Sequence, residues 1–344
     1  MSQTDLALMG FGNVGRALAR LLLAKRDELK ERYGIDWRVV GVAGRRAGAA
    51  INPRGIDLDR ALALVEGGGS LGELSASPAP DGPDFVRACG AQVLFENTPI
   101  NYETGQPAID YVRAALESGM HAITANKGPV VHAYRELRDL ARARGKRFYF
   151  EAAVMDGAPL FSLWRAALPG ARLISFRGIL NSTTNLILTL MESGQTFDEA
   201  VAQAQSIGVA ETDPSGDILG WDAAVKVAAL CTVLMDVPLK PQQVERQGIE
   251  SMTPALLREA REEERRWKLV CQAEHGAGGL RASVAPERLS SDDPLYAVMG
   301  TSSSITFVTD VLGPLTVTED STGPETTAYG LLADFINAVG ASSP

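Results

Sequence analysis

Short apolar runs alternate with amphipathic stretches through the first 150 residues of the chain. The apolar runs predict strands at Leu6–Met9, Arg38–Ala43, Gln92–Phe95, Ala122–Thr124 and Arg147–Phe150. The amphipathic stretches predict helices at Val14–Arg32, Leu58–Glu66, Gly105–Glu117 and Val131–Arg144. Strands that alternate with helices indicate right-handed crossovers and a parallel sheet covered on both faces. The segment Gly67–Asp84 is rich in glycine, proline and serine, so we expect a long loop there.

The pattern changes after Phe150. A strand is expected at Arg172–Leu180, followed by a mainly helical block from Thr183 to Ala273, in which the run REAREEERRWK has the charge distribution of a solvated helix. The remaining elements expected are strands at Leu280–Ala285, Ile305–Thr309 and Leu315–Thr318 and a last helix at Thr326–Ala338.

These patterns predict an α/β protein with two domains. Residues 1–150 would form a Rossmann-type, doubly wound parallel sheet that binds a dinucleotide. Residues 151–323 would form an α+β domain, and the last helix, within 324–344, would pack back on the first domain.

Composition narrows the class of partner. The 344 residues are 45% hydrophobic, and their net charge of −9 argues against nucleic acid or an anionic membrane as the main partner. No stretch approaches the roughly 18 uncharged apolar residues of a membrane helix, and the N-terminus lacks the basic region of a signal peptide. Three widely spaced cysteines suit a reducing cytoplasm, and three histidines without metal spacing argue against zinc. We therefore expect a cytoplasmic protein with a small-molecule ligand.

The stretch GFGNVG directly follows the first predicted strand and has the spacing G-x-G-x-x-G. In this motif the first glycine permits a tight turn, the second lets the backbone approach a pyrophosphate, and the third lets helix and strand pack closely. The helix that follows presents free N–H groups to the phosphates. The predicted dinucleotide-binding residues are Gly10, Phe11, Gly12, Asn13, Val14 and Gly15.

The end of the second strand bears on the choice of dinucleotide. NAD-specific sites usually carry an acid there, whereas an arginine accommodates the additional phosphate of NADP. Here the strand is followed by Gly44, Arg45 and Arg46. The two arginines favour NADP(H), although solvated loop arginines would look the same.

Two lysines are candidates for chemistry. Asp222 and Lys226 are four residues apart, on one face of a helix that we expect to run from Ile218 to Met235 with Asp217 as its cap. Because a buried ion pair stabilises little compared with apolar residues, this pair is better explained by a polar cleft than by stability. Lys127 follows the strand Ala122–Thr124, at the sheet edge where doubly wound folds bind ligands.

Together these motifs resemble homoserine dehydrogenase, and the likeness extends over nearly the whole chain. It rests on GFGNVG, TANKGP (124–129), EAAVMDGAP (151–159) and GILNSTTN (178–185). Its most specific part is AETDPSGDILGWDAAVK (210–226), which matches the family pattern E-x-D-P-x-x-D-x-x-G-x-D-x-x-x-K at every fixed position.

The resemblance implies hydride transfer between NAD(P)H and aspartate 4-semialdehyde, giving homoserine. It implies that Lys226 donates the proton, that Lys127 contacts cofactor and substrate and shares the acid–base role, and that Asp222 orders the polar network. The substrate residues that it implies are Glu211, Asp217, Asp222 and Thr183, and the further cofactor residues are Thr98 and Gly323. It also implies that the domain of residues 151–323 binds the substrate and joins two chains in a homodimer. A further implication is a monovalent cation such as sodium held by the loop residues Glu151, Val154, Asp156 and Ala158.

The chain departs from the family pattern in places that matter for specificity. Ser182 stands where glycine is usual, Val209 stands where tyrosine or phenylalanine is usual, and Gly323 is the only glycine of the loop STGPETTA. Because the sequence stops at Pro344, we expect a short form without a regulatory ACT domain. Two alternatives stay open: a paralogous reductase of another small amino or hydroxy aldehyde, and a catalytically silent NADP-binding sensor.

Overall fold

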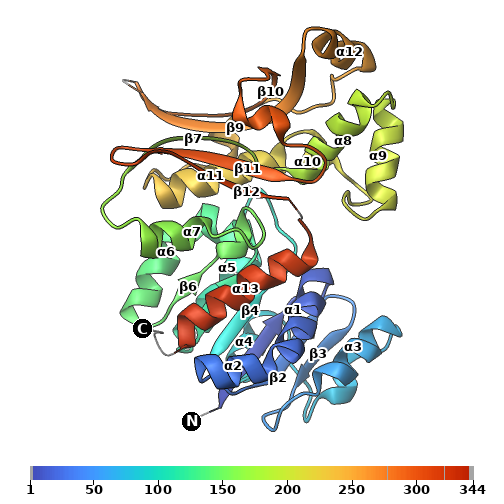
Figure 1. Ribbon diagram of the computed structural model, residues 1–344. Helices are drawn as coiled ribbons and strands as arrows, with labels where there is room; N and C mark the ends of the chain where they lie inside the picture. The colour runs from blue at the N-terminus through green and yellow to red at the C-terminus, as the bar shows by residue number, and fades with distance from the viewer. Residues whose placement is uncertain (1–2, 277, 321, 341–344) are drawn as a thin grey trace. The chain divides into compact units, whose positions relative to one another are not determined.

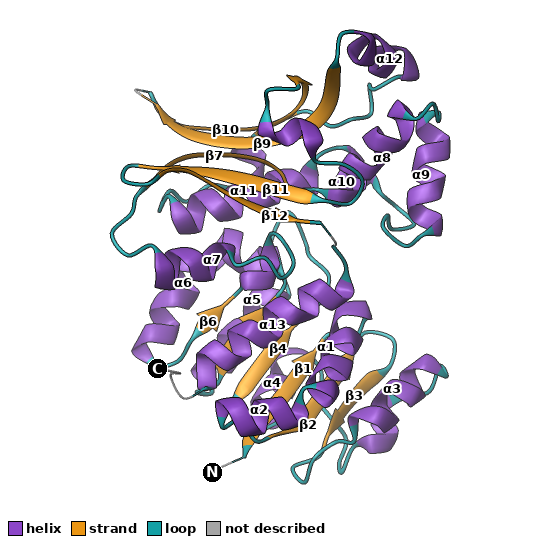
Figure 2. Ribbon diagram, in the orientation of Figure 1, coloured by secondary structure: helices purple, strands orange, loops and turns teal. Residues whose placement is uncertain are grey.

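The computed structural model describes residues 3–276, 278–320 and 322–340. The chain divides into two compact units. One comprises the chain up to Pro159 together with the segment from Pro324 onward, and the other runs from Leu160 to Gly323. Figures 1 and 2 label the helices and strands of both units.

The first unit is built on a sheet with the strand order β3-β2-β1-β4-β5-β6. Its strands are β1 (Thr4–Met9), β2 (Trp37–Gly44), β3 (Gly48–Ile51), β4 (Val93–Glu96), β5 (His121–Thr124) and β6 (Phe148–Tyr149). All neighbouring pairs are parallel except β2 and β3, which are antiparallel. The strand order reverses between β1 and β4, so the predicted α/β fold with a Rossmann-type doubly wound sheet is confirmed.

The helices of this unit are α1 (Asn13–Ala24), α2 (Arg26–Tyr33), α3 (Leu58–Glu66), α4 (Gly82–Ala88), α5 (Ala108–Glu117), α6 (Lys127–Ala143) and α13 (Pro324–Val339). Figure 1 shows α13, from the end of the chain, beside α1, from its beginning. Leu331, Leu332 and Phe335 of α13 lie in the same buried cluster as the strand residues Leu6 and Phe95. The last helix therefore completes the core of the first unit, while residues 341–344 of the predicted segment lie outside the described residues.

Three local predictions for this unit were wrong. The helix expected at Val14–Arg32 is two helices that meet at Lys25. The short strand β3 was missed because four residues give little periodic signal; it forms a hairpin with β2 instead of a loop. The segment expected as a loop contains a 3₁₀ turn at Leu71–Leu74 and the start of α4, where Pro83 occupies a first-turn position that suits proline.

The second unit contains a sheet with the order β12-β11-β7-β9-β10-β8. Its strands are β7 (Leu173–Ile179), β8 (Glu245–Arg246), β9 (Arg265–Gly276), β10 (Gly279–Ser290), β11 (Ser303–Thr309) and β12 (Gly313–Glu319). Its helices are α7 (Leu160–Ser162), α8 (Ser182–Glu192), α9 (Phe197–Ser206), α10 (Ser215–Ile218), α11 (Trp221–Leu234) and α12 (Pro254–Glu262). The expectation of a second α+β fold is therefore met, with every strand pair antiparallel except β8 with β10.

The structure corrects two helix predictions in this unit. The charged run REAREEERRWK is not one helix, because α12 ends at Glu262 and the strand β9 begins at Arg265. Between them Glu264 has a φ of 56°, which a helix cannot contain. The helix expected from Ile218 to Met235 is interrupted by Gly220, whose φ of 75° separates α10 from α11.

Among the described residues, no helix combines the length and the apolar character that crossing a membrane requires.

Candidate active site

The glycine loop has the geometry that a dinucleotide requires. Gly10, with a φ of 100°, packs so closely on the next loop that a Cβ would lie 2.5 Å from the carbonyl carbon of Asn97. A Cβ on Gly15 would lie 2.1 Å from the carbonyl oxygen of Gly10. A Cβ on Gly12 would meet no atom of the described chain within 4 Å, so this side of the loop is open to a ligand.

The start of α1 is equally suited to bind phosphate. Its N-cap is Gly12, which has no side chain to cap the first turn, so the N–H groups there can meet an anion. Phe11 is buried in the core and offers only its backbone. Asn13 is exposed and accepts a hydrogen bond from Arg16, and Val14 is half-buried.

Arg45 and Arg46 lie exposed in the turn of the β2–β3 hairpin. The preceding strand end is tied to the glycine loop, because the N–H of Gly10 donates to the carbonyl of Ala43 over 2.8 Å. The structure thus brings two cationic side chains to the sheet edge beside the glycine loop.

The exits of β4 and β5 bring Thr98 and Lys127 to the same edge of the sheet. Lys127 is the first residue of α6 and is half-buried. The side chain of Asn126, the N-cap of α6, accepts from the N–H of Gly128 and donates to the carbonyl of Thr98 over 2.9 Å. Sequence reasoning missed Glu96, a fully buried carboxylate next to these residues.

The segment from Glu151 to Ala158 forms a compact loop against α13. Glu151, Val154 and Ala158 are buried, and the N–H of Glu151 donates to the carboxylate of Asp334 over 2.6 Å. The carboxylate of Asp156 accepts from the hydroxyl of Thr327 over 3.0 Å. Among the described residues, no group of three or more histidine, cysteine, aspartate or glutamate side chains could hold a metal ion. Gly323 is half-buried at the end of the second unit.

A polar cluster lies where α8, α10 and α11 meet in the second unit. The ammonium nitrogen of Lys226 is 3.0 Å from a carboxylate oxygen of Asp222, and it donates to the carbonyl of Leu180 over 2.6 Å. The two side chains are only 15% and 11% exposed. Helical spacing therefore does place these two groups on one face of α11, in contact and largely withdrawn from water.

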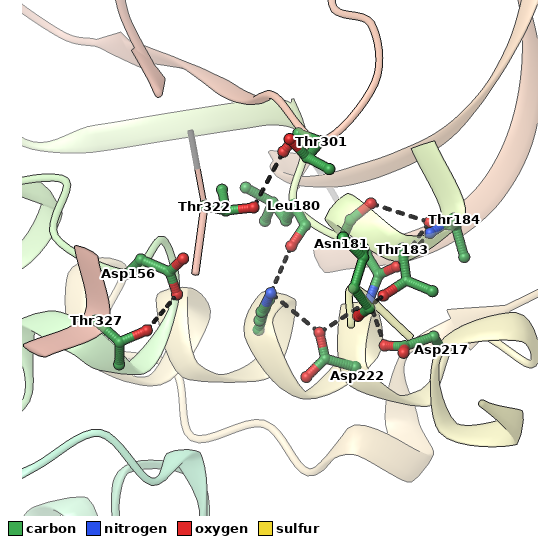
Figure 3. Close-up of polar contacts among 12 residues, drawn as sticks. Asp156, Leu180, Asn181, Thr183, Thr184, Asp217, Asp222, Thr301, Thr322 and Thr327 are labelled. Carbon is green, nitrogen blue, oxygen red and sulfur yellow. Dashed lines mark hydrogen bonds and ion pairs between the residues drawn. The ribbon is translucent and has the colours of Figure 1, made fainter. Parts of the chain in front are cut away.

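Asn181 joins the carboxylates of this cluster. Its side-chain N–H₂ donates to Asp217 over 2.7 Å and to Asp222 over 3.1 Å, and Figure 3 shows it between them. The side-chain carbonyl oxygen of Asn181 accepts from the N–H and from the hydroxyl of Thr184, both over 2.8 Å, and thereby caps α8. Sequence reasoning overlooked Asn181, although asparagine before serine and threonine at a helix start is an N-cap signal.

The other predicted substrate residues differ in how close they come to this cluster. Asp217 lies within α10 and does not cap α11, because Gly220 occupies that position. Burial, and then the charge of Asp222, raise the pKa of Asp217. Thr183 is buried and donates to the carbonyl of Val209 over 3.3 Å. Glu211 lies exposed on the loop before α10, and its side chain makes no hydrogen bond or ion pair with the cluster among the described residues.

Comparison with known proteins shows the family to which this chain belongs. Residues 10–151 match the family model described as the NAD-binding domain of homoserine dehydrogenase, and residues 159–336 match the model described as homoserine dehydrogenase. The chain is 37% identical over 339 residues to an NAD(+)-dependent homoserine dehydrogenase of Pseudomonas canavaninivorans, covering 98% of this chain and 96% of that protein. It is 35% identical to a homoserine dehydrogenase of Methanocaldococcus jannaschii, covering 97% and 98% of the two chains.

Solved structures show the same fold. A hyperthermophilic archaeal homoserine dehydrogenase in complex with NADPH superposes with a TM-score of 0.82 at 30% identity, covering 98% of each chain. The resemblance seen in the motifs is thereby confirmed, and this chain is an NAD(P)-dependent oxidoreductase that belongs to the homoserine dehydrogenase family.

Proposed function

We propose that this protein interconverts aspartate 4-semialdehyde and homoserine with NADP(H), in threonine and methionine biosynthesis. The observation that carries the proposal is the pair of Lys226 and Asp222, 3.0 Å apart on the largely buried helix α11. A structural role explains such a pair poorly, because desolvation of two charges offsets their attraction.

Lys226 is the proposed acid and base. When the aldehyde is reduced its oxygen gains negative charge, and a cation that can give a proton lowers this barrier. In the oxidative direction the same amine takes the proton from the hydroxyl group. The carboxylate of Asp222 and the carbonyl of Leu180 orient the ammonium group, each by a short contact. The nicotinamide cofactor supplies or accepts the hydride when it is bound.

The carboxylates are the proposed site for the ammonium group of the amino-acid substrate. Asp217 and Asp222 lie together on either side of Asn181. The side chain of Thr183 hydrogen-bonds to Asp217 and donates to the carbonyl of Val209. Glu211 is exposed on the loop before α10, so in this proposal the loop closes over the substrate and brings Glu211 to the substrate ammonium group. A substrate ammonium between two carboxylates would also offset their mutual repulsion.

The glycine loop and its surroundings are the proposed cofactor site. The open side of Gly12 and the uncapped start of α1 suit a pyrophosphate, and Thr98 and Lys127 would hold the nicotinamide end. Arg45 and Arg46, exposed at the end of β2 where NAD-specific sites carry an acid, support NADP(H). The relative from Pseudomonas canavaninivorans is described as NAD(+)-dependent. The cofactor preference of this protein is therefore to be measured with NADPH and with NADH.

Two residues support a second candidate, a reductase of another small amino or hydroxy aldehyde. Ser182 opens α8 one residue after Asn181, and Val209 accepts the hydrogen bond of Thr183. Both positions border the carboxylate cluster and differ from the usual family residues, so they are the places where a different substrate would be selected. The third reading, a silent sensor, leaves the pair on α11 without a purpose.

Further features of the proposal follow from the family. They are a homodimer, a monovalent cation held by Glu151, Val154, Asp156 and Ala158, and a cytoplasmic location. The three cysteines are free and buried, as is usual in a reducing compartment.

The proposal is tested by following absorbance of the reduced nicotinamide. Purified protein is mixed with aspartate 4-semialdehyde and NADPH or NADH, and in the reverse direction with homoserine and each oxidised cofactor. Rapid turnover with NADPH and slow turnover with NADH is the expected result. Turnover only with other aldehydes selects the second candidate, and cofactor binding without turnover on any aldehyde selects the sensor.

A further inference from the structure

Glu96 is a charged residue in the middle of the first unit's sheet. It is the last residue of β4, and its exposed fraction is 0%. In the parallel ladder it lies between Met9 of β1 and Thr124 of β5. It therefore stands at the carboxyl edge of the sheet, beside the point where the strand order reverses and where dinucleotides bind.

The carboxylate accepts hydrogen bonds from two sides. One oxygen accepts from the N–H of Thr98 over 2.8 Å and from the Thr98 hydroxyl. The other accepts from the hydroxyl of Thr124 over 2.7 Å. Glu96 thus connects the turn after β4 with the end of β5.

A second set of bonds closes this connection into a ring. The hydroxyl of Thr124 accepts from the N–H of Asn126 over 2.9 Å, and the side chain of Asn126 donates to the carbonyl of Thr98 over 2.9 Å. Asn126 also caps α6, whose first residue is Lys127. The ring of Glu96, Thr98, Asn126 and Thr124 therefore fixes the turn after β4 relative to Lys127.

The chemistry of Glu96 argues that this ring is more than core packing. A buried carboxylate costs free energy, and an apolar side chain would fill the end of a buried strand more cheaply. Burial raises the pKa of Glu96, and the hydrogen bonds from Thr98 and Thr124 oppose that rise. A desolvated acid kept at a ligand-binding edge is a mark of function.

The turn that Glu96 holds also contacts the glycine loop. The backbone of Asn97 approaches Gly10 so closely that no side chain fits there. The turn after β4 is therefore held by two contacts: its Asn97 backbone packs against the glycine loop, and its Thr98 is hydrogen-bonded to Glu96. A displacement of the Glu96 carboxylate would therefore shift both Thr98 and Lys127.

We propose that Glu96 is a positioning residue for the nicotinamide end of the cofactor, acting through Thr98 and through Asn126 on Lys127. This inference rests on the proposed function, in which the nicotinamide binds at this edge. Glu96 would not touch the reacting atoms, because it is fully buried.

The test compares E96M and T124V with the wild type. Methionine is about as long as glutamate and carries no acceptor oxygen, so Glu96→Met removes both sides of the ring, whereas Thr124→Val removes one side alone. The matched control is Asp5→Asn: Asp5 lies at the opposite end of the same sheet and pairs with Arg38 at 2.5 Å. Dissociation constants are measured by fluorescence for NADPH and by calorimetry for its fragment without nicotinamide, 2′-phospho-ADP-ribose, below the melting temperature of each variant.

We expect E96M to bind NADPH about ten-fold more weakly and T124V to shift in the same direction by less, while both keep the fragment affinity within about two-fold. D5N should lose thermal stability and change neither affinity. Equal losses for NADPH and the fragment, or unchanged NADPH affinity in both variants, would overturn the inference. If the wild type prefers NADH, the same comparison is made with NADH and ADP-ribose. Wild-type protein that binds neither dinucleotide would instead refute the proposed function.

Discussion

The ammonium group of Lys226 lies 3.0 Å from the carboxylate of Asp222, one turn earlier on the same helix. Both side chains are largely withdrawn from water, so the pair gains little net stability from its attraction. Its second contact, from Lys226 to the carbonyl of Leu180 over 2.6 Å, fixes the direction of the amine. The two contacts together hold the ammonium group of Lys226 in one orientation, and a proton donor requires a fixed orientation.

Replacing Lys226 should abolish turnover and spare cofactor binding. We expect Lys226→Met to lower kcat by about 10²- to 10⁴-fold, because the developing alkoxide loses its proton donor. The affinity for NADPH, measured by fluorescence titration, should be unchanged, since the lysine lies in the cluster of α8, α10 and α11 and the glycine loop lies in the other unit. Lys30→Met, at an exposed position on α2, is the matched control.

The same measurement separates the two candidate lysines. Lys127→Met should weaken NADPH binding as well as lowering kcat, since Lys127 starts α6 at the cofactor edge. A Lys226 variant that keeps near-normal turnover would contradict the assignment and transfer the acid–base role to Lys127.

The charge of Asp217 should lower the free energy of unfolding and strengthen substrate binding. Its pKa is raised in the folded protein above its ordinary value of 3.8, by burial and then by Asp222. The unfolded state therefore loses this proton at a lower pH than the folded state, and the folded state is penalised as pH rises through the interval between the two pKa values. Asp217→Asn removes the charge and can still accept from Asn181.

We expect D217N to raise the free energy of unfolding by about 1 kcal/mol at neutral pH, with no gain below the ordinary pKa of the carboxyl. Its KM for homoserine should rise about ten-fold, because one carboxylate for the ammonium group is lost. Urea unfolding at neutral and acid pH, with steady-state kinetics, checks both. A gain in stability that is equal at every pH would show that the charge of Asp217 is not its cause.

The first unit was readable from the sequence because its signals are local. Alternating apolar runs predicted five of its six strands, and the glycine spacing predicted the turn at Gly10 that the structure contains. The same local logic failed for β9. Lys268 looks like part of a solvated charged face, yet it is fully buried and donates to Asn185 and Val298, which lie far away in sequence.

The candidate site divides in the same way. Helical spacing joined Asp222 to Lys226, since both belong to one helix. No spacing rule relates Asn181 to Asp217, or Glu96 to Thr124, because their partners come from separate elements that only the tertiary structure assembles. The prediction that Asp217 caps a helix was wrong for a related reason. The positive φ of Gly220 ends α10 and makes Gly220, not Asp217, the N-cap of α11.

The hairpin arginines should control the choice of dinucleotide. The double variant Arg45→Ala, Arg46→Ala is expected to raise the KM for NADPH by about ten-fold or more and to leave the KM for NADH nearly unchanged, because only NADPH carries the additional phosphate. Arg54→Ala, another exposed arginine of the first unit, is the control. Equal changes for both cofactors would show that the arginines act on something other than the phosphate.

The buried amine of Lys268 should make stability depend on pH in the alkaline range. Burial lowers the pKa of Lys268 from 10.5 to about 8, while its ammonium group donates to the side chain of Asn185 over 3.0 Å and to the carbonyl of Val298 over 2.5 Å. Between these two pKa values the unfolded chain holds the proton and the folded protein does not. This group therefore adds to the free energy of unfolding as pH rises, by at most about 1.4 kcal/mol per pH unit.

Lys268→Met removes that contribution, so the difference in unfolding free energy between wild type and variant should increase in favour of the wild type from about pH 8 to about pH 10. Subtracting the variant cancels the titration of the other lysines and tyrosines, which both proteins share. Lys30→Met, which removes an exposed lysine with the same chemistry, should follow the wild-type curve over this range. Parallel curves for wild type and K268M, measured by urea unfolding, would mean that the amine keeps its proton in the folded state, and the packing of β9 against α8 would then have to accommodate a permanent charge.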